Sequence, residues 1–381
     1  FQLDEKVTVE IFPQQKDFAI RTFGLPGGAG FLGVCFGRVI TANSPAAQGP
    51  SLTSWESVLW HEFCHVVTLE LTGNRLPRWL SEGISVYEEN LTGKGWGQRM
   101  SPDYRQRFLS GKFTPLGQLS SAFLAPGSGA DLQFAYFESA LAVEYLVEKH
   151  GLERLKRVLL GLGAGQSVNE ALEQHVGQIN RLEEDFAKFA RERAEQLAPG
   201  LDFTEPPGEA EERPAPERWL ADHPNSYWAL AALAAKHVRA ERWDDARPLA
   251  TKLIELYPDC HDGENAYALL AAIERGAKNR AAERDVLRRW AERDASAPEC
   301  YLRLMAIAAE DQDWPLVSQT AQRMLAVNPL VAEPWRQLAA AAEAGGDGAS
   351  AIGAYQKTLL FDPADPAEVN YRLAALLHAQ A

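Results

Sequence analysis

The sequence predicts two parts of different architecture: an α+β domain with a small mixed sheet and several helices, followed by an all-α solenoid. Three observations support this prediction. Alternating, β-branched segments are found near the start of the chain. From about residue 54 onward, apolar residues recur with a helical period. After residue 216 the composition shifts towards Ala, Leu, Arg and Trp, and turn signals separate helical segments at a nearly regular spacing.

Strands are predicted at residues 7–12, 31–37 and 38–43, with a short helix over residues 17–22. The glycine-rich stretch 24–30 is predicted to be a turn. It does not fit a phosphate loop, because neither a Lys-Ser/Thr pair nor a helix follows it. The strand 38–43 is our candidate for a sheet edge that pairs with an extended peptide. The alternative is an ordinary strand of the sheet.

Helices of the first domain are predicted over residues 54–72, 77–89, 101–109, 132–149, 152–162, 168–174 and 181–197. Gly73 stands where the helix 54–72 would end in a left-handed turn, and Gly151 stands just past the end of the helix 132–149. Residues 114–129 are expected to be irregular.

Residues 199–216 carry five prolines and several glutamates, which is typical of a linker. We therefore place the first domain at residues 1–198, the linker at 199–216 and the repeat domain at 217–381.

In the repeat domain, prolines mark turns at spacings of 40, 31 and 34 residues, at Pro258, Pro298, Pro329 and Pro363. A helix–turn–helix period near 34 is typical of tetratricopeptide repeats. We expect about four helix pairs and a trailing helix over residues 368–379. Such a solenoid can hold a substrate or a protein partner in its concave groove, or it can simply support the first domain.

An H-E-x-x-H motif begins at His61, within the predicted helix 54–72. His61 and His65 are one turn apart on the same helix face, with Cβ atoms about 6 Å apart. Two imidazoles at that separation suit tetrahedral zinc. Glu62 is rotated by about 100° from His61 and would lie beside the ion, which suits a general base for a metal-bound water. The alternative is a pair of histidines satisfied within the core.

A third ligand can come from the next helix. Glu82 follows His65 after sixteen intervening residues, and the chain between them is predicted to reverse at Gly73. His61, His65 and Glu82 would fill three zinc positions and leave the fourth for a water, whose pKa zinc lowers towards 7. Glu82 could also be an acid favoured near the start of a helix by the macrodipole, and both interpretations can hold together.

H-E-x-x-H followed by W-L-x-E-G-x-x-x-Y resembles the gluzincin metallopeptidases, and more closely the peptidase-MA-like domains found beside tetratricopeptide repeats in bacterial chains. The resemblance covers roughly residues 6–160. It implies a zincin-like fold for the first domain and one zinc ion per chain. It also implies that His61, His65 and Glu82 are the zinc ligands and that Glu62 is the base and proton shuttle.

The segment from Tyr136 to Gly151 is similar to the Y-x-x-S…Y-L…G helix that follows the active site in that family. The resemblance implies a phenol or imidazole near the developing oxyanion, and Tyr136 is our candidate. A packed aromatic side chain is the alternative, and Tyr87 and Tyr104 are further candidates. No G-x-M-E-N segment of the aminopeptidases precedes the motif, which favours an endopeptidase. Val86 stands where thermolysin-like members have an aspartate that supports the ligands, so the sequence leaves the orientation of the imidazoles open.

Composition disfavours other classes of protein. A net charge of −14 argues against a general nucleic-acid or anionic-membrane binder. No apolar run approaches the roughly 20 residues that span a bilayer. The four cysteines fit no zinc or disulfide pattern, although a Cys260–Cys300 bridge is conceivable, and Cys64 is expected to be buried. The sequence starts at Phe1, so a signal peptide could have been removed, and the compartment stays undetermined.

From these observations we expect a zinc-dependent peptidase, specifically an endopeptidase, in which zinc activates a water and Glu62 is the general base. Its substrate would be a peptide or protein, and its repeats would bind this substrate or a partner. The alternative is a catalytically silent pseudopeptidase that acts as a scaffold through its repeats.

Overall fold

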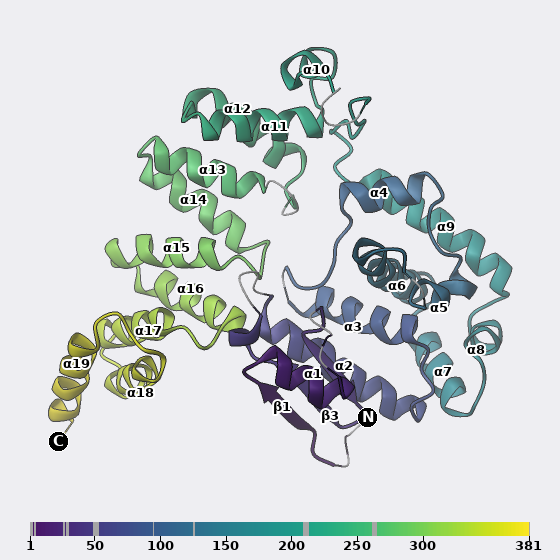
Figure 1. Cartoon of the computed structure of the whole chain (residues 1–381), viewed down its shortest axis with the longest axis horizontal. Coiled ribbons are helices and arrows are strands. Elements are labelled where there is room, and N and C mark those ends of the chain that lie inside the picture. The colour runs from purple at the N-terminus through teal and green to yellow at the C-terminus, as the bar shows by residue number, and fades with distance from the viewer. Residues whose placement is uncertain are drawn as a thin grey trace. The chain divides into compact units, whose positions relative to one another are not determined.

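The computed structural model describes residues 3, 5–25, 27, 30–48, 53–93, 95–124, 126–208, 213–260 and 265–380. Its internal contacts divide the chain into two units. Unit 1 comprises Phe1–Asn43 and Ser57–Glu205, and unit 2 comprises Ser44–Glu56 and Pro206–Ala381. Figure 1 labels most of the helices and strands of both units.

A small mixed sheet is present near the start of unit 1, as predicted. In its described part the strands are β1 (Thr8–Phe12), β2 (Gly33–Phe36) and β3 (Val39–Asn43), in the spatial order β1-β3-β2. β3 pairs in parallel with β1 and antiparallel with β2. Gly37, with φ of 63°, lies in the tight connection between β2 and β3.

The prediction that residues 38–43 form an edge strand is wrong. β3 is hydrogen-bonded on both sides, so its backbone has no free edge for a peptide. The reason is the crossover through α1 (Gln15–Phe23), which lets β1 pair in parallel with β3, while the hairpin places β2 on the other side. In the described sheet, β1 and β2 are the edges.

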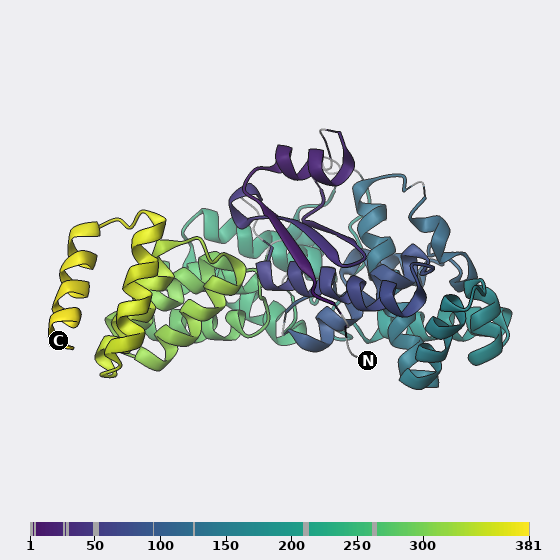
Figure 2. The same ribbon diagram turned by 90° about the horizontal axis from the view of Figure 1, so that it is seen from below.

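The sheet lies between α1 and α2 (Trp55–Thr72), and Figure 2 shows these helices on opposite sides of the strands. On one face, the hydroxyls of Thr22 in α1 and Thr41 in β3 are 3.0 Å apart and share a hydrogen bond. On the other face, Gly33 of β2 lies directly against the side chain of Glu62 in α2. This second contact places β2 beside the H-E-x-x-H motif.

Except for the short helix α5, which was not predicted, the remaining helices of unit 1 agree closely with the predicted segments. They are α3 (Arg78–Thr92), α4 (Pro102–Leu109), α5 (Leu119–Ala122), α6 (Gly129–His150), α7 (Leu152–Gly163), α8 (Val168–His175) and α9 (Ile179–Gln196). Gly73 and Gly151 directly follow α2 and α6, as predicted, and their φ values are 56° and 87°. The stretch expected to be irregular contains α5 and a 3₁₀ turn at Leu116–Gln118.

The core of unit 1 forms around the crossing of α3 and α6. At that crossing the helices approach so closely that a Cβ on Gly83 would stand 2.6 Å from the backbone oxygen of Ser139. Glycine is therefore required for this separation. Large aromatic side chains fill the surrounding core: Trp79, Phe108, Phe134, Phe137, Tyr145 and Phe186. The close approach brings Glu82 of α3 near Tyr136 of α6.

Unit 2 is built from successive helix pairs, which pack on one another in chain order. In its described part the pairs are α11 (Tyr227–Arg239) with α12 (Trp243–Leu256), α13 (Ala266–Gly276) with α14 (Arg280–Ala291), α15 (Pro298–Glu310) with α16 (Trp314–Val327), and α17 (Ala332–Ala344) with α18 (Gly348–Thr358). α10 (Pro216–Asp222) precedes them and α19 (Pro366–Ala379) follows. Helix pairs and a trailing helix were predicted, but α10 was not. That the pairs are tetratricopeptide repeats stays a prediction.

Two further expectations concern cysteines and membrane spans. Cys64 is buried, as predicted. Cys300 carries a free thiol that donates to the backbone oxygen of Leu287, so the Cys260–Cys300 bridge is not formed. None of the described helices combines the length and the apolar character needed to cross a bilayer.

Candidate metal centre

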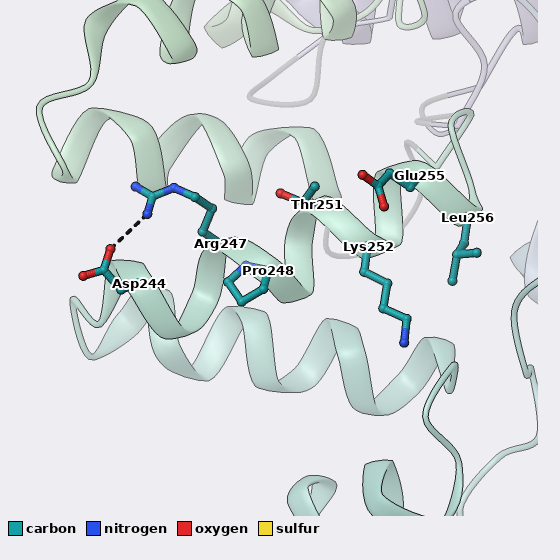
Figure 3. Close-up of a pocket in the computed structure, with 7 residues that line it drawn as sticks. All are labelled: Asp244, Arg247, Pro248, Thr251, Lys252, Glu255 and Leu256. Carbon is teal, nitrogen blue, oxygen red and sulfur yellow. Dashed lines mark hydrogen bonds and ion pairs between the residues drawn. The ribbon is translucent and has the colours of Figure 1, made fainter.

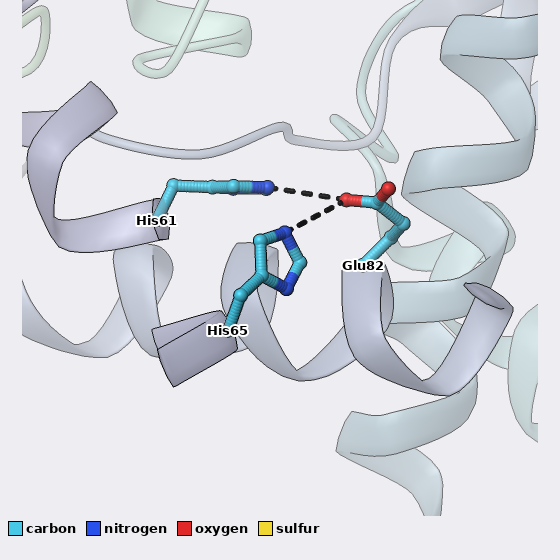
Figure 4. Close-up of side chains that lie close together, drawn as sticks. All are labelled: His61, His65 and Glu82. Carbon is cyan, nitrogen blue, oxygen red and sulfur yellow. Dashed lines mark hydrogen bonds and ion pairs between the residues drawn. The ribbon is translucent and has the colours of Figure 1, made fainter. Parts of the chain in front are cut away.

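The two histidines of the motif and Glu82 converge on one point. His61 and His65 leave the same face of α2, with ring centres 4.8 Å apart. The Nε2 atoms of His61 and His65 lie 3.2 and 3.3 Å from Oε2 of Glu82, and Figure 4 shows the two interactions meeting at this one oxygen. Their potential ligand atoms all lie within 4.8 Å of one another. In the described part of the chain, this is the one such group of His, Cys, Asp or Glu side chains.

The reversal between α2 and α3 places Glu82 opposite the histidines. Gly73 and Asn74 both have positive φ, 56° and 62°, and Pro77 precedes the first residue of α3. Trp79 and Leu80 are buried and fix the first turn of α3 in the core. Glu82, one turn further, therefore faces α2.

The second ring nitrogen of His61 has a carboxylate partner. Nδ1 of His61 is hydrogen-bonded to Oε1 of Glu89, and Oε2 of Glu89 accepts a hydrogen bond of 3.2 Å from Oγ of Ser57. A carboxylate accepts hydrogen bonds, so Nδ1 is the protonated nitrogen and Nε2 of the neutral ring keeps its lone pair for a metal.

His65 is oriented by serines instead. Its Nδ1 lies 2.8 Å from Oγ of Ser81 and 3.3 Å from Oγ of Ser85. The hydroxyl of Ser85 donates to the backbone oxygen of His61 at 3.2 Å, so its oxygen is available to accept from His65. Nδ1 of His65 is therefore the protonated nitrogen, and the lone pair of its Nε2 is directed towards Glu82.

These contacts show that the residues fit a metal ion. Two imidazole lone pairs and a carboxylate oxygen would repel one another unless a cation lies between them. Without a metal, a proton takes that role. Burial lowers the pKa of His61, but the hydrogen bonds with Glu82 and Glu89 outweigh this effect and raise the pKa to about 10. Burial raises the pKa of Glu82, but its hydrogen bonds with His61 and His65 hold it far below its usual range.

Glu62 lies beside the cluster, as its position in the helix predicts. It is 6% exposed. A Cβ placed on Gly33 would be 2.7 Å from both Cγ and Oε1 of Glu62, so the backbone of β2 presses on this carboxylate. Burial, above all, raises the pKa of Glu62, and the neighbouring charges of His61 and His65 oppose this effect. A buried carboxyl with a raised pKa suits the transfer of a proton.

Tyr136 also reaches the cluster. Its hydroxyl lies 3.4 Å from Oε1 of Glu82 and accepts a hydrogen bond of 3.3 Å from Nη2 of Arg78. Burial is the main cause that raises the pKa of Tyr136 to about 12, so the phenol is a proton donor at neutral pH. Tyr104, in contrast, stacks on Phe137 with ring centres 4.8 Å apart.

Tyr87, the third aromatic candidate, packs at the edge of the same core. Of the three tyrosines considered, Tyr136 is the one with a hydrogen bond to Glu82.

Sequence reasoning missed the residues that support the ligands: Ser57, Arg78, Ser81, Ser85 and Glu89. One signal was available. Glu89 is seven residues after Glu82, which is close to two helical turns and puts both carboxylates on one face of α3. Val86 is buried in the core instead, so the carboxylate comes from a different position of the helix than in the thermolysin-like pattern.

Comparison with known families agrees with this geometry. Residues 37–191 match the family model of the Peptidase MA superfamily. The chain therefore contains a Peptidase MA superfamily domain that includes α2, α3 and α6, although the match spans less than half of the 381 residues. The expected resemblance is thus confirmed at the level of the superfamily. A search among curated proteins gave no match.

Proposed function

We propose that the chain is a zinc-dependent endopeptidase with one zinc ion, held by His61, His65 and Glu82. The observation that carries this proposal is the convergence of Nε2 of His61, Nε2 of His65 and Oε2 of Glu82. Glu62 beside that point adds a group that can move a proton. The superfamily match supports a peptidase.

A bound zinc ion would supply Lewis acidity towards the scissile carbonyl and towards a water molecule. Glu62 takes a proton from that water, whose oxygen adds to the carbonyl carbon. When the carbon–nitrogen bond breaks, Glu62 returns the proton to the leaving nitrogen. The burial of Glu62 supports both steps, because a raised pKa lowers the cost of holding the proton between them.

Tyr136 is our candidate for stabilising the oxyanion. Its protonated hydroxyl lies next to Glu82 on the wall of the cluster. A hydroxyl group has one proton to donate. To stabilise the oxyanion, the hydroxyl of Tyr136 must therefore turn from Glu82 to the substrate.

We propose that an extended substrate pairs with β2. In the described sheet β2 is an edge strand, and Gly33 at its start touches Glu62. A peptide hydrogen-bonded to this edge would run past the base. This assignment replaces β3, which has no free edge.

For the domain organisation we propose a metallopeptidase domain at residues 1–198, a linker at 199–216 and a tetratricopeptide-like repeat domain at 217–381, which binds the substrate or a protein partner. Its helix pairs support the proposal. Figure 3 shows a surface hollow whose lining, in the part of the chain that the structure describes, comes from α12. Arg247 in it is paired with Asp244 and with Glu274 of α13 at 2.9 and 2.6 Å. Because this charge is already compensated, we assign the hollow no part in substrate binding.

The test compares zinc content and proteolysis in three proteins. Wild type should bind about one zinc per chain and cleave an unfolded protein substrate. Glu62→Gln should keep the zinc and lose turnover, whereas His65→Ala should lose the zinc. Equal cleavage by Glu62→Gln and wild type would refute Glu62 as the base. Absence of zinc from the wild type, even after zinc is supplied, would instead favour a scaffold.

A further inference from the structure

The two carboxylate oxygens of Glu82 have different surroundings. Oε2 faces the Nε2 atoms of His61 and His65 at 3.2 and 3.3 Å. Oε1 lies 3.3 Å from Nε of Arg78 and 3.4 Å from the hydroxyl of Tyr136. One oxygen is therefore directed to the imidazoles, while the other is held by two donors. This division matters because a free carboxylate can bind a metal through one oxygen or through both.

Arg78 is fixed in place from several sides. It is the first residue of α3, one turn before Glu82. Nη2 of Arg78 donates to the hydroxyl of Tyr136, and its guanidinium lies 5.0 Å above the ring of Phe123. Phe123 is itself buried, and its ring meets that of Tyr136 edge-on at 5.4 Å. A planar guanidinium held this way presents its donors in a fixed direction.

We propose that, in the absence of substrate, Arg78 and Tyr136 form a clamp on Oε1 of Glu82, so that Glu82 offers only Oε2 to the metal; when the Tyr136 hydroxyl turns to the substrate, Arg78 keeps its contact with Oε1. The inference rests on the proposed zinc site and adds a positioning residue to it. Arg78 acts through Glu82, and the clamp leaves a metal position open for the water and substrate. Without the clamp, the carboxylate can rotate and bind through both oxygens, which would add a fifth ligand atom beside the water.

A different role for Arg78 would give different results. The side chain of Arg78 is 42% exposed, and an exposed ion pair between residues i and i+4 contributes little to stability. If Arg78 were only such a surface pair, its removal would leave metal binding unchanged. Metal binding therefore separates the two interpretations without any measurement of turnover.

The experiment measures the metal site of the full chain in four variants: Arg78→Gln, Arg78→Lys, Tyr136→Phe and the control Arg75→Gln. Arg75 lies in the turn before α3 and donates to the backbone oxygen of Gly163, so it matches Arg78 in type and position but not in contact. Zinc affinity is measured by competition with a chelator. The visible absorption of Co²⁺ in the same site reports coordination, because four-coordinate Co²⁺ absorbs more strongly than five-coordinate Co²⁺.

We expect Arg78→Gln to weaken zinc binding about 10-fold and to lower the Co²⁺ absorption. Tyr136→Phe should shift both in the same direction by a smaller amount. Arg78→Lys should resemble Arg78→Gln, because an ammonium group cannot reach Glu82 and Tyr136 as a fork does. Arg75→Gln should match wild type. Wild-type affinity and a wild-type Co²⁺ spectrum in Arg78→Gln would overturn the clamp.

Three further outcomes also bear on the two proposals. If Arg78→Gln does not fold, Tyr136→Phe provides the test, because it removes only a hydroxyl group, and an unchanged spectrum there overturns the clamp. A wild-type protein that binds zinc but cleaves no peptide would contradict the proposed endopeptidase and leave the clamp measurable. A wild-type protein that binds neither zinc nor Co²⁺ would overturn both.

Discussion

At the scale of single residues, the orientation of His61 depends on Glu89. The carboxylate of Glu89 holds Nδ1 of His61 and is itself held by Ser57 of the same helix as the histidine. A carboxylate on the far nitrogen fixes the direction of the ring and makes the near nitrogen a stronger ligand. Its charge should therefore be important for metal affinity.

We predict that Glu89→Gln weakens zinc binding about 10- to 100-fold, because the amide keeps the size of the side chain and loses its charge. The measurement is zinc affinity by chelator competition. Glu88→Gln is the matched control, since Glu88 is the preceding residue of α3 and its pKa is raised by burial alone. Equal affinities of Glu89→Gln and Glu88→Gln would contradict the role of Glu89.

Gly33 provides a way to move the proposed base, Glu62, without a change at the proposed ligands. An added Cβ would lie 2.7 Å from Cγ and Oε1 of Glu62, so Gly33→Ala must displace that buried carboxylate. We predict that kcat falls by roughly 100-fold, as expected for a shift of about 1 Å, while zinc affinity stays unchanged. Gly30→Ala is the control, because a Cβ there meets no atom within 4 Å. Wild-type kcat in Gly33→Ala would show that Glu62 is not positioned by β2.

The three converging residues could be predicted because their geometry follows from helix spacing. His61 and His65 share a face in any α-helix, and the turn at Gly73 returns the chain past them. The spacing of Arg78 and Glu82, four residues apart in α3, is compatible with an ion pair. The hydrogen bond from Tyr136 to the same carboxylate depends on the crossing of α3 and α6, which are far apart in sequence, so the spacing could not predict the complete clamp.

At the scale of elements, α6 carries a buried carboxyl that the proposed chemistry does not use. Glu138 is 1% exposed, and its Oε2 accepts a hydrogen bond of 3.0 Å from the backbone N–H of Thr114. Burial raises the pKa of Glu138 to about 7, against the opposing effects of Thr114 and Arg107. Glu138 thus connects α6 to the segment before α5 by a hydrogen bond. Because its carboxyl is buried, the free energy of unfolding depends on pH.

The sign of that dependence follows from the raised pKa. Below about pH 4.5 Glu138 is protonated in both the folded and unfolded states, whereas above about pH 7 it is charged in both. The stability that Glu138 contributes is therefore fully present below pH 4.5 and is lost as the pH rises towards 7. The loss amounts to about 3 kcal/mol in the free energy of unfolding. We predict that the free energy of unfolding of Glu138→Gln, taken relative to that of wild type, is about 3 kcal/mol higher at pH 8 than at pH 4.

The measurement is chemical denaturation of both proteins at the two pH values. Glu148→Gln, near the end of α6, is the control. The pKa of Glu148 is lowered, mainly by a hydrogen bond with Lys149. The free energy of unfolding of Glu148→Gln, relative to wild type, should therefore fall rather than rise between pH 4 and pH 8. A difference between Glu138→Gln and wild type that does not vary with pH would show that Glu138 keeps an ordinary pKa.

Elements were easiest to predict where local chemistry marks their ends. Gly151 ends α6 where its position suggested, because a residue at φ of 87° favours glycine. The order of the strands was harder. A five-residue strand can pair on either side, and only the crossover through α1 decides that β3 is central. The prediction for residues 38–43 failed for this reason.

At the scale of the whole molecule, the proposed metal affects only one of the two units. His61, His65 and Glu82 all belong to unit 1, and the described part of unit 2 holds no comparable group. A ligand that binds the folded state raises the free energy of unfolding of the part that holds it. Metal binding should therefore raise the free energy of unfolding of unit 1 and leave that of unit 2 unchanged.

We predict that calorimetry of the full chain resolves a transition that zinc shifts and a transition that it does not. At a free zinc concentration of 100 times Kd, the gain is about 2.7 kcal/mol, which corresponds to roughly 5–10 °C for a unit of about 200 residues. His65→Ala should abolish the shift. His150→Ala should retain it, because His150 contacts the hydroxyl of Tyr145 at 3.3 Å and is not part of the metal cluster. If zinc shifted His65→Ala as much as wild type, the stabilising ion would be bound elsewhere, and the convergence of His61, His65 and Glu82 would not be its site.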